Sequence, residues 1–166
     1  MATAAERARK KDLGPDWRET LSASIKRFVR RSVGVALIGL SIAIGVALIT
    51  HSSVDPSFTT AAGGPPANWL GQFGSYVSDA LLFLFGPAAG LFLPLVALIG
   101  LRMVGGDDTG PSKRALLVAG LGVLLIGVAL GLYAGSAVSG LPAGYGGALG
   151  LAGAYGVDWA VKLIGN

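Results

Sequence analysis

Few side chains in this sequence of 166 residues have the chemistry of acids, bases or metal ligands. His51 is the single histidine and cysteine is absent, so His51 lacks partners for a metal site and we expect a polar residue at a membrane rim. A charge-relay triad is disfavoured because no context orients that ring. Asp79 precedes an apolar run, where we expect it to cap a helix in preference to relaying protons. We therefore predict no enzyme activity, no metal and no cofactor.

A phosphate-binding loop is excluded at the glycines of residues 105–110. The loop pattern requires Lys directly after the second Gly, where Pro111 stands instead. The net charge of +4 suggests nucleic-acid binding at first sight, but the basic residues flank apolar segments. Membrane orientation and contact with anionic lipid explain that placement better, and we predict no direct nucleic-acid binding by this chain.

The composition places the chain among membrane proteins. Apolar residues make up 52% of it and charged residues 13%, about half the fraction in a typical soluble domain. The same numbers exclude intrinsic disorder, which requires low hydrophobicity and high charge. The 27 glycines lie largely within apolar runs, where transmembrane helices tolerate them.

Three uncharged runs are long enough to cross a bilayer as helices. They cover about residues 33–50, 80–101 and 115–138, so we predict an all-α membrane protein with three spans in a transmembrane domain of residues 32–139. Pro87 and Pro94 lie within the second run. Each removes a backbone donor, so we expect a kink or a local break there.

The distribution of Lys and Arg predicts the topology. Nine of the 13 basic residues lie in residues 1–31, and residues 32–101 contain none. Because cytoplasmic segments are enriched in Lys and Arg, we expect residues 1–31 and the loop 102–114 inside, and the loop 51–79 outside. The residues that we expect to set the topology and contact anionic lipid are Lys26, Arg27, Arg30, Arg31, Arg102, Lys113 and Arg114.

The basic N-terminal segment has the pattern of an amphipathic helix. Asp16 and Glu19 resemble a capping box, and Trp17, Leu21 and Phe28 follow at helical spacing. This helix is either a lead-in to the membrane surface or a docking helix for a protein partner.

Residues 140–166 form a glycine-rich segment that is harder to interpret. A weak apolar stripe predicts an interfacial helix over about 147–164 on the outer side. The alternative is a short fourth span that returns inside and brings Lys162 near the cytoplasm.

Glycines at intervals of four predict close helix packing. Gly127, Gly131 and Gly135 line one face of the third span, and Gly86 and Gly90 repeat the spacing in the second. Small residues at this spacing allow two helix backbones to approach. The stripe serves either packing within the chain or self-association, and we expect a homo-oligomer.

The predicted outer loop carries an ordered set of features that continues into the second span. We expect its residues first to shape the loop and second to contact a partner, since Asp55 can cap its own turn and Pro56 pre-sets it. The loop residues are Asp55, Pro56, Ser57, Phe58, Asn68 and Trp69, and the sequence continues as Gly74-Ser75-Tyr76-Val77-Ser78-Asp79, Phe85-Gly86 and Leu93-Pro94-Leu95.

This order of features resembles the N-terminal membrane domain of the FtsK/SpoIIIE DNA translocases. The resemblance runs from about residue 26 to 140, with a more diffuse likeness in the glycines that follow. It implies four spans, a bacterial inner-membrane location at the division septum, divisome membrane proteins as partners, and a cytoplasmic DNA motor. Nothing in these 166 residues corresponds to that motor, so ATP and DNA binding are not transferred.

We therefore expect an inner-membrane anchor and interaction module of an FtsK-like translocase, with the N-terminus cytoplasmic. The alternatives are a small oligomeric channel or transport protein, and an accessory subunit of a larger membrane complex. If the chain ends after three spans, its C-terminus lies outside.

Overall fold

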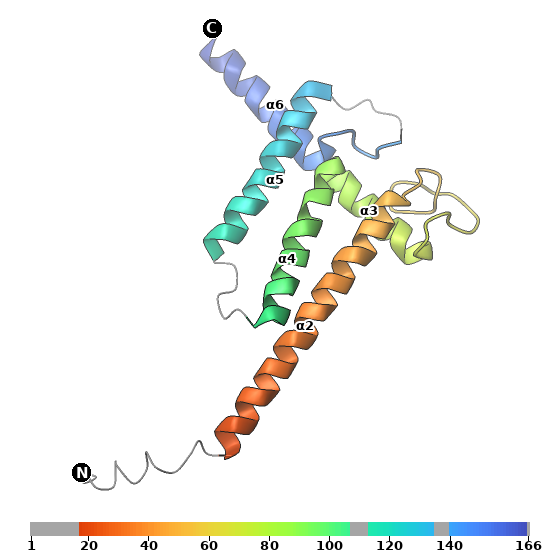
Figure 1. Cartoon of the computed structure of the whole chain (residues 1–166). Coiled ribbons are helices and arrows are strands. Elements are labelled where there is room, and N and C mark those ends of the chain that lie inside the picture. The colour runs from red at the N-terminus through yellow and green to blue at the C-terminus, as the bar shows by residue number, and fades with distance from the viewer. Residues whose placement is uncertain (1–16, 107–112, 135–139, 166) are drawn as a thin grey trace.

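The structure is a computed structural model that describes residues 17–106, 113–134 and 140–165 (Figure 1). The regular elements in these ranges are all helical. In chain order they are α2 (Trp17–Ile49), α3 (Gly71–Phe85), the 3₁₀ helix η1 (Gly86–Leu91), α4 (Phe92–Gly105), α5 (Lys113–Ala134) and α6 (Gly147–Ile164). Three helical stretches are long and apolar enough to cross a membrane, namely Trp17–Ile49, Gly71–Gly105 and Lys113–Ala134. The prediction of an all-α membrane protein with three spans is confirmed.

The basic segment and the first span form one continuous helix. No Gly or Pro interrupts the sequence between Trp17 and Val33, and α2 runs unbroken for 33 residues. At 1.5 Å per residue its length is about 50 Å, well beyond the hydrocarbon thickness of about 30 Å. Its basic half therefore projects beyond α4 and α5 (Figure 1). The predicted cap at Asp16 lies outside the described residues.

The second span is interrupted, and the predicted break is confirmed at Pro87. Gly86 takes a positive φ of 60°, Pro87 follows in η1, and a regular helix resumes only at Phe92. Pro94 lies in the first turn of α4, where a missing N–H leaves no helical bond unmade, so the helix continues through it.

The prediction that Asp79 caps the start of this span is wrong. Asp79 lies well inside α3, because that helix begins at Gly71. Its carboxylate is buried and accepts hydrogen bonds from the preceding loop, as described below.

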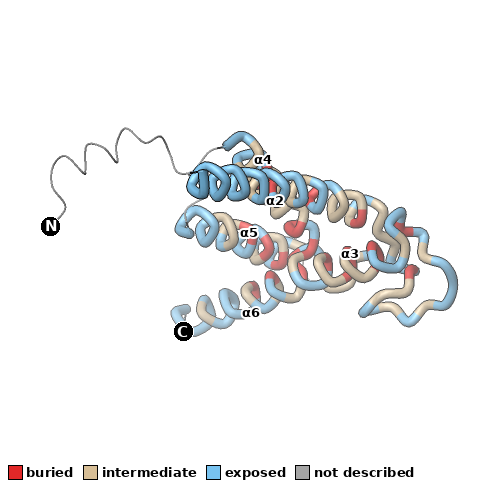
Figure 2. Tube along the Cα trace, turned by 90° about the horizontal axis from the view of Figure 1, so that it is seen from below, coloured by how far each residue is buried: buried red, intermediate tan, exposed pale blue. Residues whose placement is uncertain are grey.

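Small residues bring α2 and α4 into contact along much of their length. Gly34 and Gly100 face each other so closely that a Cβ on either would lie 2.7 Å from the carbonyl oxygen of the other. Further along, the Ser41 hydroxyl donates to the Leu93 carbonyl at 2.8 Å. Figure 2 shows buried positions on the facing sides of the helices, while the basic half of α2 is exposed.

α6 crosses α5 at a second seam of small residues. A Cβ on Gly131 would lie 3.1 Å from the Gly150 carbonyl oxygen, and one on Gly146 would lie 2.9 Å from the Gly127 carbonyl oxygen. The described part of the predicted stripe, Gly127 and Gly131, thus packs within the chain, while Gly135 lies outside the described residues. From this crossing α6 runs away from the end where α5 begins (Figure 1). Whether α6 lies at the membrane interface or forms a fourth span stays a prediction.

Candidate functional site

One end of the bundle gathers the loop 51–70, α3 and residues 140–146 (Figure 1), and we call it the loop end. Buried polar side chains concentrate there. A polar group removed from water must find hydrogen bonds in the protein, so these side chains indicate a hydrogen-bonded network. Of the six buried polar or charged residues in the described chain, five belong to the loop end, and Ser41 is the sixth. The five are Asp55, Asn68, Ser75, Ser78 and Asp79.

Asp55 closes the loop on itself. Its carboxylate is 4% exposed and accepts the backbone N–H groups of Ala67 and Asn68, both at 2.9 Å. The neighbouring Pro56 carbonyl accepts the Ser75 hydroxyl at 2.9 Å, which fastens the loop to α3. Ser57 donates its N–H to the Thr60 carbonyl at 3.0 Å and forms the turn that follows.

Asn68 links the end of α2 to the start of α3. Its Nδ2 donates to the carbonyls of Ala47 and Thr50, at 2.9 and 3.3 Å, which are among the orphan acceptors at the C-terminus of α2. Its Oδ1 accepts the Leu70 N–H at 3.1 Å. Gly74 makes this position possible, because a Cβ there would collide with the Asn68 side chain.

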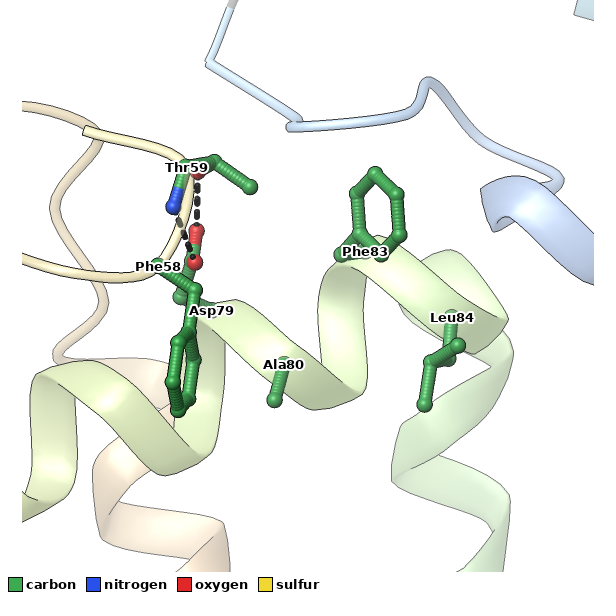
Figure 3. A pocket seen from close by; sticks show the side chains of 6 residues that line it. All are labelled: Phe58, Thr59, Asp79, Ala80, Phe83 and Leu84. Atoms are coloured by element: carbon green, nitrogen blue, oxygen red, sulfur yellow. Dashed lines mark hydrogen bonds between the residues drawn. The ribbon is translucent and has the colours of Figure 1, made fainter.

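Thr59 and Asp79 form a second fastening between the loop and α3 (Figure 3). The Thr59 N–H donates to Asp79 Oδ2 at 3.0 Å, and the Thr59 hydroxyl donates to Oδ1 at 2.6 Å. Asp79 is 1% exposed. Next to it the Phe58 ring meets Tyr76 edge to face, with centroids 4.8 Å apart. The loop is thus held to α3 through backbone, carboxylate and ring contacts.

His51 is the first residue of this loop and is partly buried. Its Nδ1 lies 3.0 Å from the Ser78 hydroxyl, which itself donates to the Ser75 carbonyl at 3.1 Å. The buried Nε2 has no hydrogen-bond partner in the described structure. Across the described ranges, no three His, Asp or Glu side chains come together as a metal site would require.

The remaining predicted residues fall into three places. The Trp69 side chain is 82% exposed, although the backbone N–H of Trp69 donates to Thr50 Oγ1 at 3.3 Å. Gly86 packs its backbone against Tyr145 and Gly147, whereas Gly90 has no atom within 4 Å of a Cβ position. The predicted basic residues lie away from the loop end, on the basic half of α2 and at the ends of α4 and α5. They are exposed except for Arg30, and comprise Lys26, Arg27, Arg30, Arg31, Arg102, Lys113 and Arg114.

Sequence reasoning missed Thr59 and the buried face of α3. That face carries Ser75, Ser78 and Asp79 at helical spacing, which makes a buried polar stripe along the helix. Such a stripe signals that another polar segment covers the helix, here the loop. Nothing in the sequence distinguishes Thr59 from its neighbour Thr60.

These features define a multi-pass membrane domain whose helices are joined by a hydrogen-bonded extramembrane loop. The family described as the 4TM region of DNA translocase FtsK/SpoIIIE matches residues 26–166, and the chain belongs to this family. The match extends beyond residue 140, to the end of the given sequence.

Similar proteins include the DNA translocases FtsK of Agrobacterium fabrum, 30% identical over 82% of this chain, and of Caulobacter vibrioides, 28% identical over 79%. That of Mesorhizobium japonicum is 35% identical over 85%. The chain spans only 15 to 16% of the length of these three relatives. No solved structure matches it.

Proposed function

We propose that this chain is the inner-membrane anchor and interaction module of an FtsK-like DNA translocase that acts in cell division and chromosome segregation. Membership of the family and three candidate spans support the anchoring role. In this proposal the 166 residues contribute no motor activity; their relatives are named as translocases, and the chain matches a small part of their length.

The proposed orientation places the N-terminus in the cytoplasm and the loop end outside. The exposed cations of α2 and the basic start of α5 support it, since cytoplasmic ends of spans are enriched in Lys and Arg. Because α2 as a whole is longer than a bilayer requires, its basic half then lies at the inner surface, where Arg27 and Arg31 meet anionic lipid.

The interaction role is supported by exposed aromatic side chains on a loop that hydrogen bonds hold in place. Phe58, Trp69 and Phe73 are 75, 82 and 73% exposed on a loop and helix start that buried hydrogen bonds hold in place. Large apolar side chains displayed on a rigid surface favour protein contact, because little conformational entropy is lost on binding. We propose that this surface contacts divisome membrane proteins and that the chain works as a homo-oligomer.

An oligomeric channel has less support. The buried polar side chains of the loop end, such as Asp55 and Asn68, are engaged in hydrogen bonds that shape the loop. This pattern is typical of a folded loop and not of the polar lining of a channel.

A chimera tests the proposal. In Caulobacter vibrioides, this chain replaces the corresponding membrane region of the resident FtsK, with a fluorescent protein at its N-terminus. We expect fluorescence to concentrate at the septum, and an even envelope signal would contradict the proposal. The matched variant Asp55→Ala should still fractionate with the membrane but lose much of its septal signal, because the loop is no longer held.

A further inference from the structure

A pocket of about 320 Å³ opens between the loop and α3 (Figure 3). Phe58 and Thr59 line it from the loop, and Asp79, Ala80, Phe83 and Leu84 line it from α3. The walls are mostly apolar, and Asp79 is the one ionisable residue among these six. The pocket therefore combines an apolar lining with a carboxylate.

A second hollow of about 110 Å³ shares Thr59 and Asp79 with the first. Its other walls are Ser53, Thr60 and residues 140–142. Asp79 thus borders both hollows, although it is 1% exposed.

The carboxylate has acceptor capacity left, and no Lys or Arg among the described residues lies beside it. Each oxygen accepts one hydrogen bond from Thr59, whereas a carboxylate can accept about four. The sequence between residues 32 and 101 contains no Lys or Arg. The described basic residues of α2, α4 and α5 lie away from the loop end, and Lys162 pairs with Asp158.

We propose that this pocket binds an arginine or lysine side chain from a partner protein on the loop side of the membrane. The aliphatic part of such a side chain lies against Phe58 and Phe83, and its cationic head pairs with Asp79. Long basic side chains combine an apolar stem with a charged tip, as this lining requires. A lipid acyl chain fits less well, because it brings no positive charge to the Asp79 carboxylate.

The partner's existence rests on the proposed function, but the chemistry of the pocket can be tested without it. The probe is butylguanidinium, and the neutral control of similar shape is butylurea. Each is titrated into the full chain in nonionic detergent micelles. The backbone amide resonance of Thr59 is followed by NMR, since that N–H bonds to Asp79 directly.

We expect a saturable shift of the Thr59 amide with butylguanidinium and a much weaker response to butylurea. Asp79→Asn should weaken binding roughly tenfold, the effect of losing one charge-assisted contact. The control Asp158→Asn, an exposed acid on α6, should bind as the unaltered chain does. Equal responses to both probes, no saturable shift, or unchanged binding by Asp79→Asn would overturn the proposal.

The Asn68 amide resonance, which reports on Asp55, shows whether the loop of each variant remains folded. If Asp79→Asn disrupts it, Phe83→Ala keeps the carboxylate and removes one wall. This variant should weaken butylguanidinium binding several-fold, and unchanged binding would count against the pocket. Loss of septal signal in the chimera together with intact probe binding would reject the proposed function alone.

Discussion

Asn68 donates its backbone N–H to Asp55 at 2.9 Å across 13 residues of loop, while its own side chain binds the end of α2. The two residues therefore act as one junction: Asp55 sets where the loop returns, and Asn68 sets where the next helix starts. Both lie almost fully buried, so water cannot replace the bonds that they make. The shape of the loop depends on this pair.

Replacing Asn68 tests the junction. Asn68→Ala removes its bonds to Ala47, Thr50 and Leu70 and leaves buried carbonyls unsatisfied, so the free energy of unfolding should fall by about 2–4 kcal/mol. Denaturation of the purified chain in mixed micelles, followed by circular dichroism, measures this. The exposed neighbour is the control: Trp69→Ala should change stability by less than about 0.5 kcal/mol. Equal losses would show that Asn68 does not hold the junction.

The fastening between Thr59 and Asp79 should control local opening of the loop. Thr59→Val removes the hydroxyl donor to a buried carboxylate but retains the backbone N–H, at a cost of about 1.5–3 kcal/mol. Hydrogen exchange of the amide at position 59 should accelerate accordingly. Thr60→Val is the matched control, because its hydroxyl bonds the exposed Ser53 carbonyl at 3.2 Å. Similar acceleration in both variants would contradict this role.

The seam between α5 and α6 should tolerate no side chain at Gly150. A methyl group there would collide with the Gly127 backbone, so Gly150→Ala should destabilise the chain by about 1–3 kcal/mol. Gly156→Ala lies on the same helix with no atom within 4 Å of the added group, and should be neutral or slightly stabilising. Thermal unfolding in detergent compares the two. If both variants melt together, the seam does not determine how α6 packs.

The sequence predicts the apolar spans well, because uncharged runs of this length have few alternatives to crossing lipid. It also predicts the break at Pro87, since proline acts locally. The role of Asp79 could not be predicted in this way. A carboxylate before an apolar run fits the start of a helix, but α3 begins eight residues earlier, at Gly71. The bond between Asp79 and Thr59 depends on how the loop folds back onto α3, which local sequence does not reveal.

The packing of the glycine faces could also be predicted only in part from the sequence. Their spacing indicates close packing but does not identify the helix they pack against, and in the structure Gly127 meets α6 of the same chain. Gly34 and Gly100 lack a repeated spacing, so their contact follows only from the alignment of α2 with α4.

The proposed topology has α2 crossing the membrane with its basic half inside and the loop end outside. Because the chain has no cysteine, single cysteines at Ser24 and Val54, both exposed, report on the two ends. Intact bacteria expressing each variant are treated with a membrane-impermeant maleimide, before and after permeabilisation. Val54→Cys should be labelled in intact cells and Ser24→Cys only after permeabilisation. Labelling of both positions in intact cells, or the reverse order, would contradict the account.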